Sequence, residues 1–376
     1  MCNHGKQSLG NWKLACYHCR LKLACLLLLF LIACSCEKST TNPPPPPAGP
    51  DTTSHHFTWQ IDTIGLYSSY LLDVAIVDEN DIWAVGEIHT AETDTFDSLG
   101  NWVPPYNAVH WDGQQWELKW IPTNSVVGIG YYPIHTVFAF GSDNIWMFSD
   151  AGSYCHWNGT NWQSQYVPER QGGINKIWGS SSTDLYFVGT NGNITHYNGS
   201  SWQKLESGTT VDIQDIWGAL NPQTGEYEIL AVASFGPVNP TEIKILQIRG
   251  TTIASVSTEG LPPGLSSIWF IPGKKYYLVG DGVFHTDEIG KSWQHDSNHP
   301  MLYKSAVRGS QIDDVIIVGG FGLVSHFNGV GWHHYKDNEL PSFFGTYGSV
   351  DYQSNFLVAV GWIGDQAIIL RGWREK

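Results

Sequence analysis

The sequence predicts an all-β fold, a seven-bladed β-propeller made of four-stranded antiparallel blades. Three observations support this prediction: a short apolar strand recurs seven times, a second motif keeps a fixed distance from it, and the composition disfavours long helices. Of the 376 residues, 13% are aromatic and only 15% are charged, with 40 Gly and 18 Trp. Ordinary domains carry more charge, and coiled coils or disordered tails carry much more.

The recurring strand is apolar and closes on Gly or another small residue. Its copies are IWAVG (82–86), IWMFS (145–149), LYFVG (185–189), ILAVA (229–233), YLVG (277–280), IIVG (316–319) and VAVG (358–361). The closing residues lie 63, 40, 44, 47, 39 and 42 positions apart. Periods of this length are typical of repeat architectures.

A His–Trp motif fixes the inside of each unit. The motif occurs as His110 and Trp116, His156 and Trp162, His196 and Trp202, and His326 and Trp332. Each pair encloses Asp-Gly or Asn-Gly, whose positive φ angles suit a two-residue type I′ hairpin. A further strand precedes the recurring one, with Trp178, Trp217 and Trp269 in equivalent places. Each unit therefore reads as four strands.

One such sheet cannot bury both of its faces, and radial packing of seven sheets solves this problem. A solenoid would need capping units, and the sequence contains no recognisable ones. Phe57–Gln60 resembles the outer strand Ser201–Lys204, although no unit precedes it. We expect this segment to complete the ring beside the last copy, which ends in Gly372-Trp373. The propeller should therefore span residues 57–376.

The units resemble the Trp-rich, Asp-box-like (BNR or kelch-like) propeller repeats of secreted bacterial proteins. Thr286–Trp293 carries this resemblance, because it matches Ser/Thr-x-Asp-x-Gly-x-Thr/Ser-Trp with Glu288 in place of the Asp. In that family the box is a structural hairpin found in enzymes and non-enzymes alike. The resemblance therefore implies an architecture and no particular activity.

The N-terminus predicts export and a lipid anchor. Residues 1–33 hold four basic residues, no acidic ones and an apolar core, as signal peptides do. Leu31-Ile32-Ala33-Cys34 resembles a bacterial lipobox, which implies lipidation at Cys34 and membrane attachment through that lipid. Cys36 is the alternative lipid site, and an ordinary signal peptide is the alternative leader. Residues 34–56, with five consecutive prolines, then form a stiff tether.

We place the protein in the bacterial cell envelope, and Ser35 after the Cys favours the outer membrane over the inner one. Sequence alone leaves open whether it faces the periplasm or the medium. The net charge of −15 argues against a nucleic-acid partner. Removal of the leader and of Cys34 and Cys36 leaves Cys155 as the one cysteine of the body, so no disulfide framework is expected.

The motifs provide no basis for a cofactor or a metal site. His110, His156, His196 and His326 share one repeat position, so a ring places them in different blades, whereas metal ligands must converge. The adjacent pairs His55-His56 and His333-His334 have no further ligands in register.

The strongest asymmetry is an insertion of about 17 residues between Gly86 and His110, on the propeller face most often used for ligands. It supplies the candidate binding residues Glu87, Glu92, Asp94, Asp97, Trp102 and Tyr106. Residues 235–244 lengthen the same loop in the fourth unit, so both loops should border one face. Trp102, Trp120 and Trp362 lie off the repeat positions, unlike most other tryptophans, which we expect to pack between blades.

We infer an envelope lipoprotein whose propeller is a non-catalytic protein- or glycan-binding module. One alternative is a carbohydrate-active enzyme (a glycoside hydrolase, lyase or glycosyltransferase) using acids of the insertion, and another is a structural spacer in a surface assembly. We favour a non-enzyme and single out no catalytic residue. A sialidase needs three arginines around its substrate, and the body holds only five, two of them at the C-terminus.

Overall fold

The computed structural model describes residues 52–375 apart from 168, 171, 236–240 and 337. The predicted leader (1–33), Cys34 and most of the predicted tether lie outside the described residues. The described part is almost entirely β, with one 3₁₀ turn, η1 (Thr190–Gly192). No helix within it is long and apolar enough to cross a membrane.

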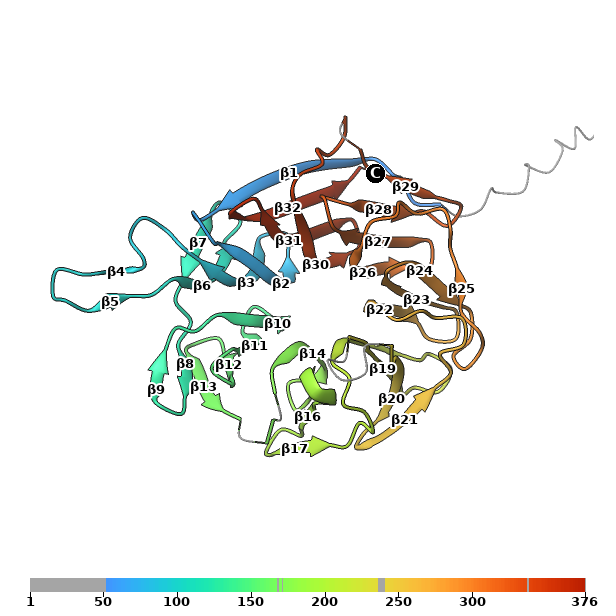
Figure 1. Ribbon diagram of the computed structural model, residues 1–376, viewed down its shortest axis with the longest axis horizontal. Helices are drawn as coiled ribbons and strands as arrows, with labels where there is room; N and C mark the ends of the chain where they lie inside the picture. The colour runs from blue at the N-terminus through green and yellow to red at the C-terminus, as the bar shows by residue number, and fades with distance from the viewer. Residues whose placement is uncertain (1–51, 168, 171, 236–240, 337, 376) are drawn as a thin grey trace, which may run out of the picture. The chain divides into compact units, whose positions relative to one another are not determined.

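Seven four-stranded antiparallel sheets form a ring of blades, as predicted (Figure 1). Blade 1 consists of β2 (Tyr70–Asp78), β3 (Asp81–Ile88), β6 (Tyr106–Trp111) and β7 (Trp116–Lys119). Blade 2 consists of β10 (Ile134–Gly141), β11 (Asn144–Ser149), β12 (Ser153–Trp157) and β13 (Trp162–Tyr166). Blade 3 consists of β14 (Ile174–Ser181), β15 (Asp184–Gly189), β16 (Ile194–Tyr197) and β17 (Trp202–Leu205). Blade 4 consists of β18 (Ile213–Leu220), β19 (Tyr227–Ala233), β20 (Lys244–Arg249) and β21 (Thr252–Val256). Blade 5 consists of β22 (Leu265–Ile271), β23 (Lys275–Gly280), β24 (Val283–Thr286) and β25 (Gln294–His295). Blade 6 consists of β26 (Lys304–Gln311), β27 (Asp314–Gly319), β28 (Val324–Phe327) and β29 (Trp332–His334). Each blade runs from an inner strand at the ring axis to an outer strand at the rim.

The seventh blade joins the two ends of the chain. It holds β30 (Gly345–Gln353), β31 (Phe356–Ile363), β32 (Gln366–Arg374) and, as its outer strand, β1 (Phe57–Ile64). β1 pairs with β32 in antiparallel register from Phe57 opposite Arg374 to Ile64 opposite Ala367. The expected ring closure by Phe57–Gln60 is therefore confirmed, and the N-terminal segment supplies one strand of this blade.

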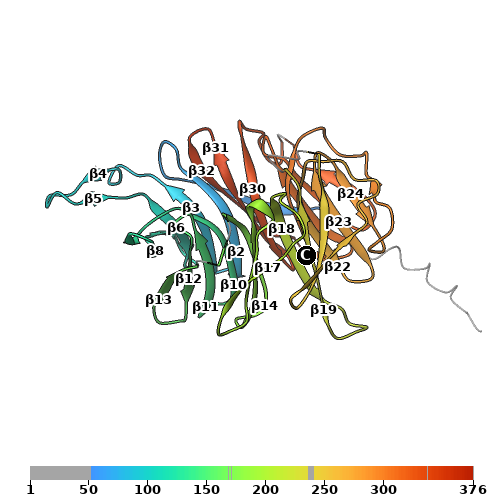
Figure 2. The same ribbon diagram turned by 60° about the horizontal axis from the view of Figure 1, so that its bottom comes forward.

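The loops at the two ends of the strands define two faces of the ring. The upper face holds the connections from each outer strand to the next inner strand and the loops between second and third strands. The lower face holds the remaining turns, the N-terminal end of β1 and the C-terminal end of β32. Figure 2 shows the ring from another side, with β4 (Thr95–Phe96) and β5 (Trp102–Val103) projecting beyond it.

The hydrophobic core is divided into seven clusters, and each lies between two neighbouring blades. Blades 3 and 4, for example, enclose a cluster containing Trp178, Tyr186 and Ile213, and blades 7 and 1 enclose one containing Leu71 and Val360. The other five clusters fill the other five gaps. No blade buries its faces alone, which is the packing that the repeat period predicts.

The closing small residue of the repeat has a steric cause. Each inner strand carries a bulge opposite it, and the bulge brings a backbone carbonyl against the closing residue. A Cβ added at Gly86 would lie 2.1 Å from the carbonyl oxygen of Tyr70, and one added at Gly189 would lie 1.9 Å from that of Gly173. Gly is therefore required at most of these positions.

The repeated histidines bind the acidic or amide residue that opens the second strand of their own blade. His110 Nε2 lies 2.9 Å from Asp81 Oδ1, and its ring stacks on Trp83 with the centroids 4.2 Å apart. The equivalent pairs are His156 with Asn144, His196 with Asp184 and His326 with Asp314. The four histidines lie in four blades, as predicted, and act as side-chain links between strands.

The predicted two-residue turn of the His–Trp motif is wrong. Trp111 pairs with Trp116 and Trp157 with Trp162, so the loop has four residues. The side-chain oxygen of Asp112 accepts hydrogen bonds from the backbone N–H groups of the second and third residues after it. Asn158, Asn198 and Asn328 do the same. This Asx cap stabilises the longer loop, and only its Gly takes a positive φ.

Ring closure should be sensitive to a single methyl group at Gly372. A Cβ there would lie 2.3 Å from Cζ3 of Trp59, across the β1–β32 pair. We expect Gly372→Ala to lower the free energy of unfolding by about 1–3 kcal/mol, because the indole must leave its packed position. Chemical denaturation of the domain 52–376 measures this loss. Gly331→Ala is the control, because nothing lies within 4 Å of its added Cβ, and an equal loss in both variants would contradict the explanation.

Candidate functional site

Exposed apolar side chains gather on the upper face. Of the 21 large apolar residues exposed among the described residues, 16 lie in upper-face connections. They are Leu66, Tyr67, Phe96, Leu99, Trp102, Trp120, Val126, Val127, Ile129, Tyr131, Tyr132, Phe235, Met301, Tyr303, Phe321 and Phe344. Four lie at lower-face turns or strand ends, namely Leu220, Tyr227, Ile312 and Val330, and Ile61 lies on the rim. Concentrated apolar surface of this kind marks interaction sites.

The insertion between β3 and β6 forms a hairpin of its own, β4 with β5. Its tip exposes Phe96, Leu99 and Trp102, and Leu99 is 84% exposed. The rings of Phe96 and Trp102 meet edge to face, with the centroids 5.4 Å apart. Of the predicted binding residues, Trp102 therefore lies at the tip of a structured arm on the upper face.

Two of the predicted acidic residues hold the base of this hairpin. The ring of His89 lies between them, with Nδ1 2.7 Å from Asp94 Oδ2 and Nε2 3.4 Å from Glu87 Oε1. Tyr70 donates its hydroxyl to Glu87 at 2.8 Å. Burial tends to raise the pKa of the Asp94 carboxyl, but hydrogen bonds from His89 and Thr93 outweigh this effect and lower it. The structure thus unites Glu87 and Asp94 through His89, a residue that sequence reasoning missed.

The other two acidic residues lie apart from this pair. Asp97 caps the tip turn, because its side chain accepts hydrogen bonds from the backbone N–H groups of Leu99 and Asn101 and from the Asn101 amide. The Asn101 side-chain and backbone bonds lower the pKa of Asp97. Glu92 is exposed, and its backbone N–H binds Thr90. The four acids are therefore not gathered around one cavity.

A second hairpin, which the sequence reasoning missed, stands in the connection from blade 1 to blade 2. It consists of β8 (Thr123–Ser125) and β9 (Gly128–Gly130), and its tip exposes Val126, Val127 and Ile129. Its residues 123–130 carry no charge. The available signal was the run VVGIGYY (126–132), an apolar stretch where the repeat calls for a loop. Residues 89–105 and 120–133 are together called the rim hairpins.

Buried and stacked side chains join the rim hairpins at their bases. Asn107 is buried and donates its amide to the carbonyl oxygens of Ile121 (2.9 Å) and Tyr132 (3.0 Å). Trp120 stacks on Tyr106 with the centroids 4.1 Å apart, and its Nε1 lies 3.2 Å from the carbonyl oxygen of Pro104. Tyr106 and Trp120, both singled out from the sequence, therefore position the hairpins, and one edge of Trp120 stays exposed.

Further aromatic residues stand on the upper face of the other blades. Phe344 lies between Phe321 and Trp362, at centroid distances of 6.4 and 6.1 Å. Phe235, which begins the predicted second loop, faces Tyr303 at 6.3 Å; residues 236–240 of that loop lie outside the described residues. Phe235 and Phe321 both have a positive φ (69° and 57°), which is strained for an aromatic residue and recurs at functional positions.

The central channel is polar midway along its length. Asp73 accepts hydrogen bonds from Lys176 (2.5 Å), Thr136 and Ser349. Asp215 accepts two from Arg308, at 2.9 and 3.0 Å, and one from Ser267. These residues come from the inner strands of all seven blades, so the hydrogen bonds and ion pairs tie those strands together across the channel. The cations are thereby engaged within the scaffold.

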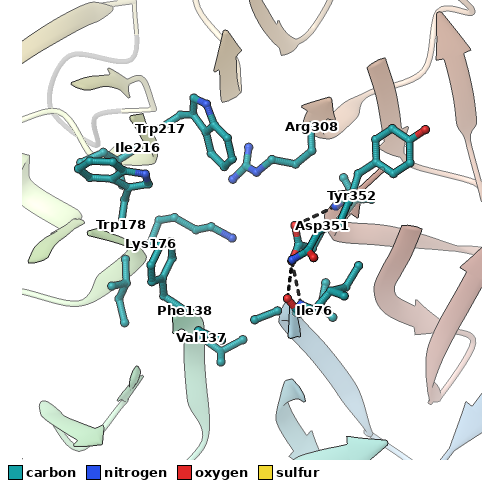
Figure 3. A pocket seen from close by; sticks show the side chains of 16 residues that line it. Ile76, Val137, Phe138, Lys176, Trp178, Ile216, Trp217, Arg308, Asp351 and Tyr352 are labelled. Carbon is teal, nitrogen blue, oxygen red and sulfur yellow. Dashed lines mark hydrogen bonds between the residues drawn. The ribbon is translucent and has the colours of Figure 1, made fainter. Parts of the chain in front are cut away.

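The lower part of the channel is a cavity of about 230 Å³ in which Phe138, Trp178 and Trp217 face Arg308 and Asp351 (Figure 3). The Asp351 carboxylate accepts hydrogen bonds from the backbone N–H groups of Ile76 and Tyr352, both at 2.8 Å. Burial raises the pKa of Asp351, and the Ile76 hydrogen bond and the charge of Arg308 act against this shift. Trp178 also packs on Gly218 of the next blade, where an added Cβ would overlap it, as the prediction of interblade packing required.

The adjacent histidine pairs meet a partner that their spacing did not reveal. His55 Nδ1 lies 2.8 Å from His326 Nδ1, and the rings of His55 and His333 are 5.3 Å apart at their centroids. Burial lowers the pKa of His55 to about 4, and the charges of the nearby His326 and His333 contribute to this shift. Among the described residues no group of three or more His, Cys, Asp and Glu is arranged to hold a metal ion.

Comparison with known proteins places the chain by fold alone. No family model and no curated protein matches the sequence. Among solved structures it is similar to YCF48 bound to a D1 peptide, with 16% identity over 86% of this chain and 99% of that one and a TM-score of 0.60. It is also similar to the WD40 propeller domain of Doa1 (11% identity, 85% and 98% covered, TM-score 0.61) and to a catalytically inactive virginiamycin B lyase from Staphylococcus aureus with quinupristin (10%, 84% and 99%, TM-score 0.53). The chain is thus a β-propeller repeat protein, and the fold itself is shared by a protein solved with a bound peptide and by a lyase.

The Asp215–Arg308 pair should stabilise the ring in a pH-dependent way. Burial opposes ionisation of Asp215, but Arg308 lowers the pKa of this carboxyl below its usual value. A lowered folded-state pKa contributes stability above the unfolded pKa of about 4, and this contribution is lost as the pH falls below it. We expect Asp215→Asn to cost about 3 kcal/mol at pH 7 and less near pH 3.

Denaturant unfolding of the domain 52–376 at several pH values measures the change. Asp287→Asn is the matched control, because Asp287 pairs with Lys275 on the surface and is 78% exposed. An exposed pair contributes about 0.5 kcal/mol or less. A cost for Asp215→Asn that matched the control, or that did not shrink at low pH, would contradict the assignment.

Proposed function

We propose that the propeller is a non-catalytic protein-binding module and that its upper face receives the partner. The observation that carries this proposal is the one-sided distribution of exposed apolar side chains, 16 of 21 on that face. Burial of such side chains against a partner provides binding free energy of about 25 cal/mol per Å² of apolar surface. The lower face, with short polar turns, offers few comparable groups.

The rim hairpins give this face a defined shape. Both are held at the base by Asn107 and Trp120, so their apolar tips are presented with little loss of backbone freedom on binding. The tip of β8–β9 carries no charge, and Val127 is 84% exposed. A protein segment with apolar and aromatic side chains complements these tips better than a charged polymer does.

The structural comparison supports a protein partner over a glycan. YCF48, which shares the fold, is solved bound to a D1 peptide. The acidic residues of the insertion favour a scaffold role over sugar hydrolysis, because Glu87 and Asp94 share the His89 ring and Asp97 caps a turn. We therefore place a glycan ligand, a carbohydrate-active enzyme and a passive spacer behind protein binding.

Lipid anchoring at Cys34 is the second part of the proposal. The first described residues lie on the lower face, where Thr53 donates its hydroxyl to the carbonyl oxygen of Asp313 at 2.8 Å. The polypeptide thus enters the propeller at the face opposite the exposed apolar side chains. Anchoring in the outer membrane and upper-face binding are thus compatible in one molecule.

Upper-face binding predicts a loss of partner capture on substitution of the β8–β9 tip. The closed ring and its seven core clusters lie within the domain 52–376, so this domain retains every described contact. We expect Val127→Asp with Ile129→Asp to reduce capture from host envelope extract at least about tenfold, since charge at an apolar contact is costly. Capture on immobilised domain with mass spectrometry measures this.

The matched control substitutes the lower face, Ile312→Asp with Val330→Asp, and should capture the same protein as the unmodified domain. Equal capture by both variants would contradict upper-face binding. A glycan-array signal that disappears when residues 90–104 are deleted would instead identify a glycan ligand.

Lipid anchoring predicts incorporation of labelled palmitate in a bacterial host. Cys34→Ser should abolish the label and release the protein from the membrane fraction, because the thiol sulfur carries the diacylglycerol. Cys36→Ser should keep both the label and the location in the membrane fraction. The reverse result would move the lipid to Cys36, and a released, unlabelled wild type would indicate an ordinary signal peptide.

A further inference from the structure

One inner strand begins with a buried charge where the other six begin with an apolar residue. The first inner-strand residue opposite the closing residue is apolar and buried in six blades: Leu71, Ile134, Ile174, Ile213, Leu265 and Tyr347. In blade 6 it is Lys304, which is only 2% exposed and lies opposite Gly319. The fold does not need a lysine there, because an apolar residue serves at every equivalent position.

The ammonium group of Lys304 has little local compensation. It donates to the carbonyl oxygen of Pro300 at 2.7 Å. Among the described residues no carboxylate lies within the ion-pair distance of 4.0 Å, and the carbonyl oxygen of Pro300 is the one hydrogen-bond acceptor that they provide for its three donors. Burial lowers the pKa of Lys304, and the negative charge of Asp281 acts against this shift. A buried charge without a partner costs stability, which a ligand can offset.

Lys304 lines a cavity of about 400 Å³ on the upper face beside blade 5, here called the Lys304 cavity. Its size lies within the range of small-molecule sites. His299 lines the same cavity, and its side chain is 2% exposed. Neither ring nitrogen of His299 has a hydrogen-bond partner within the described part of the chain. Its ring packs against Trp332 and His334, with centroid distances of 4.5 and 5.1 Å.

The remaining walls of the Lys304 cavity add negative charge and apolar surface. Asp281 and Asp296 both line it. Asp296 is hydrogen-bonded to the indole of Trp332 at 2.9 Å, whereas no donor of the described residues binds the Asp281 carboxylate. Pro300 and Leu302 supply apolar surface. A dianion such as phosphate would meet these two carboxylates, but a ligand with one anionic and one cationic end matches both charges.

We propose that the Lys304 cavity binds a free α-amino acid with an apolar side chain. Its carboxylate accepts hydrogen bonds from Lys304, and its ammonium group faces Asp281. The side chain lies against Pro300 and Leu302. This site goes beyond the proposed protein-binding function, since it adjoins blades 5 and 6 whereas the rim hairpins adjoin blades 1 and 2.

Isothermal titration calorimetry of the domain 52–376 at pH 7 tests the site with three matched probes. L-leucine has both charged groups, 4-methylpentanoate lacks the amino group, and 3-methylbutylamine lacks the carboxylate. We expect leucine to bind with a dissociation constant of about 1 mM or lower. The acid should bind at least about tenfold more weakly and the amine should not bind, because each loses one charge pair.

Lys304→Met removes the ammonium group and restores the apolar character found in the other six blades, so this variant should fold. It should lose leucine binding at least about tenfold, while Lys291→Met, an exposed lysine outside the cavity, should leave it unchanged. Leucine binding that survives Lys304→Met, or no heat from wild type with any probe up to about 10 mM, would overturn the proposal. The capture experiment with the β8–β9 tip tests the protein-binding function separately, so its result does not depend on whether leucine binds.

Discussion

Every feature of this molecule depends on the fact that a blade cannot bury its own faces. The seven core clusters all lie between neighbouring blades, so each blade is stable only because two others flank it. The β1–β32 pair is what makes this true of the first and last blades as well. The close approaches that this packing demands explain the glycines of the repeat: Gly86 clears a carbonyl of a bulged strand, and Gly218 and Gly372 clear indoles.

Most charged and polar groups near the axis serve the ring. Asp73 and Asp215 accept hydrogen bonds from side chains of five other inner strands, and the repeated histidines link strands within their blades. The upper-face connections do not have to hold the ring together, because hydrogen bonds and core packing already fix the strands that they join. They therefore vary most, with two extra hairpins, two strained aromatic residues and a buried lysine in an otherwise apolar position. Function is expected where the repeat is broken.

The candidate site was only partly readable from the sequence. The 17-residue insertion was visible as a break in the spacing, and Trp102 and Trp120, which lie off the repeat positions, are found in upper-face connections. Its acids were visible as residue types, but their partners were not, because His89 meets Glu87 and Asp94 only when the hairpin folds back. The β8–β9 hairpin was missed because it lies in a connection whose length varies between blades. The two-residue turn was mispredicted because the Asx side chain caps a longer loop.

The sequence by itself determined the repeat, its four strands, the number of blades and the segment that closes the ring. These are local and periodic properties, since strand, turn and closing glycine recur at fixed offsets. The tertiary structure alone decided which exposed side chains share a face and how the channel charges pair. It also decided that Lys304 lies where the other six blades have an apolar residue, beside His299, whose ring nitrogens make no hydrogen bond within the described residues. Those facts depend on contacts between residues far apart in the chain, and such contacts exist only once the ring has closed.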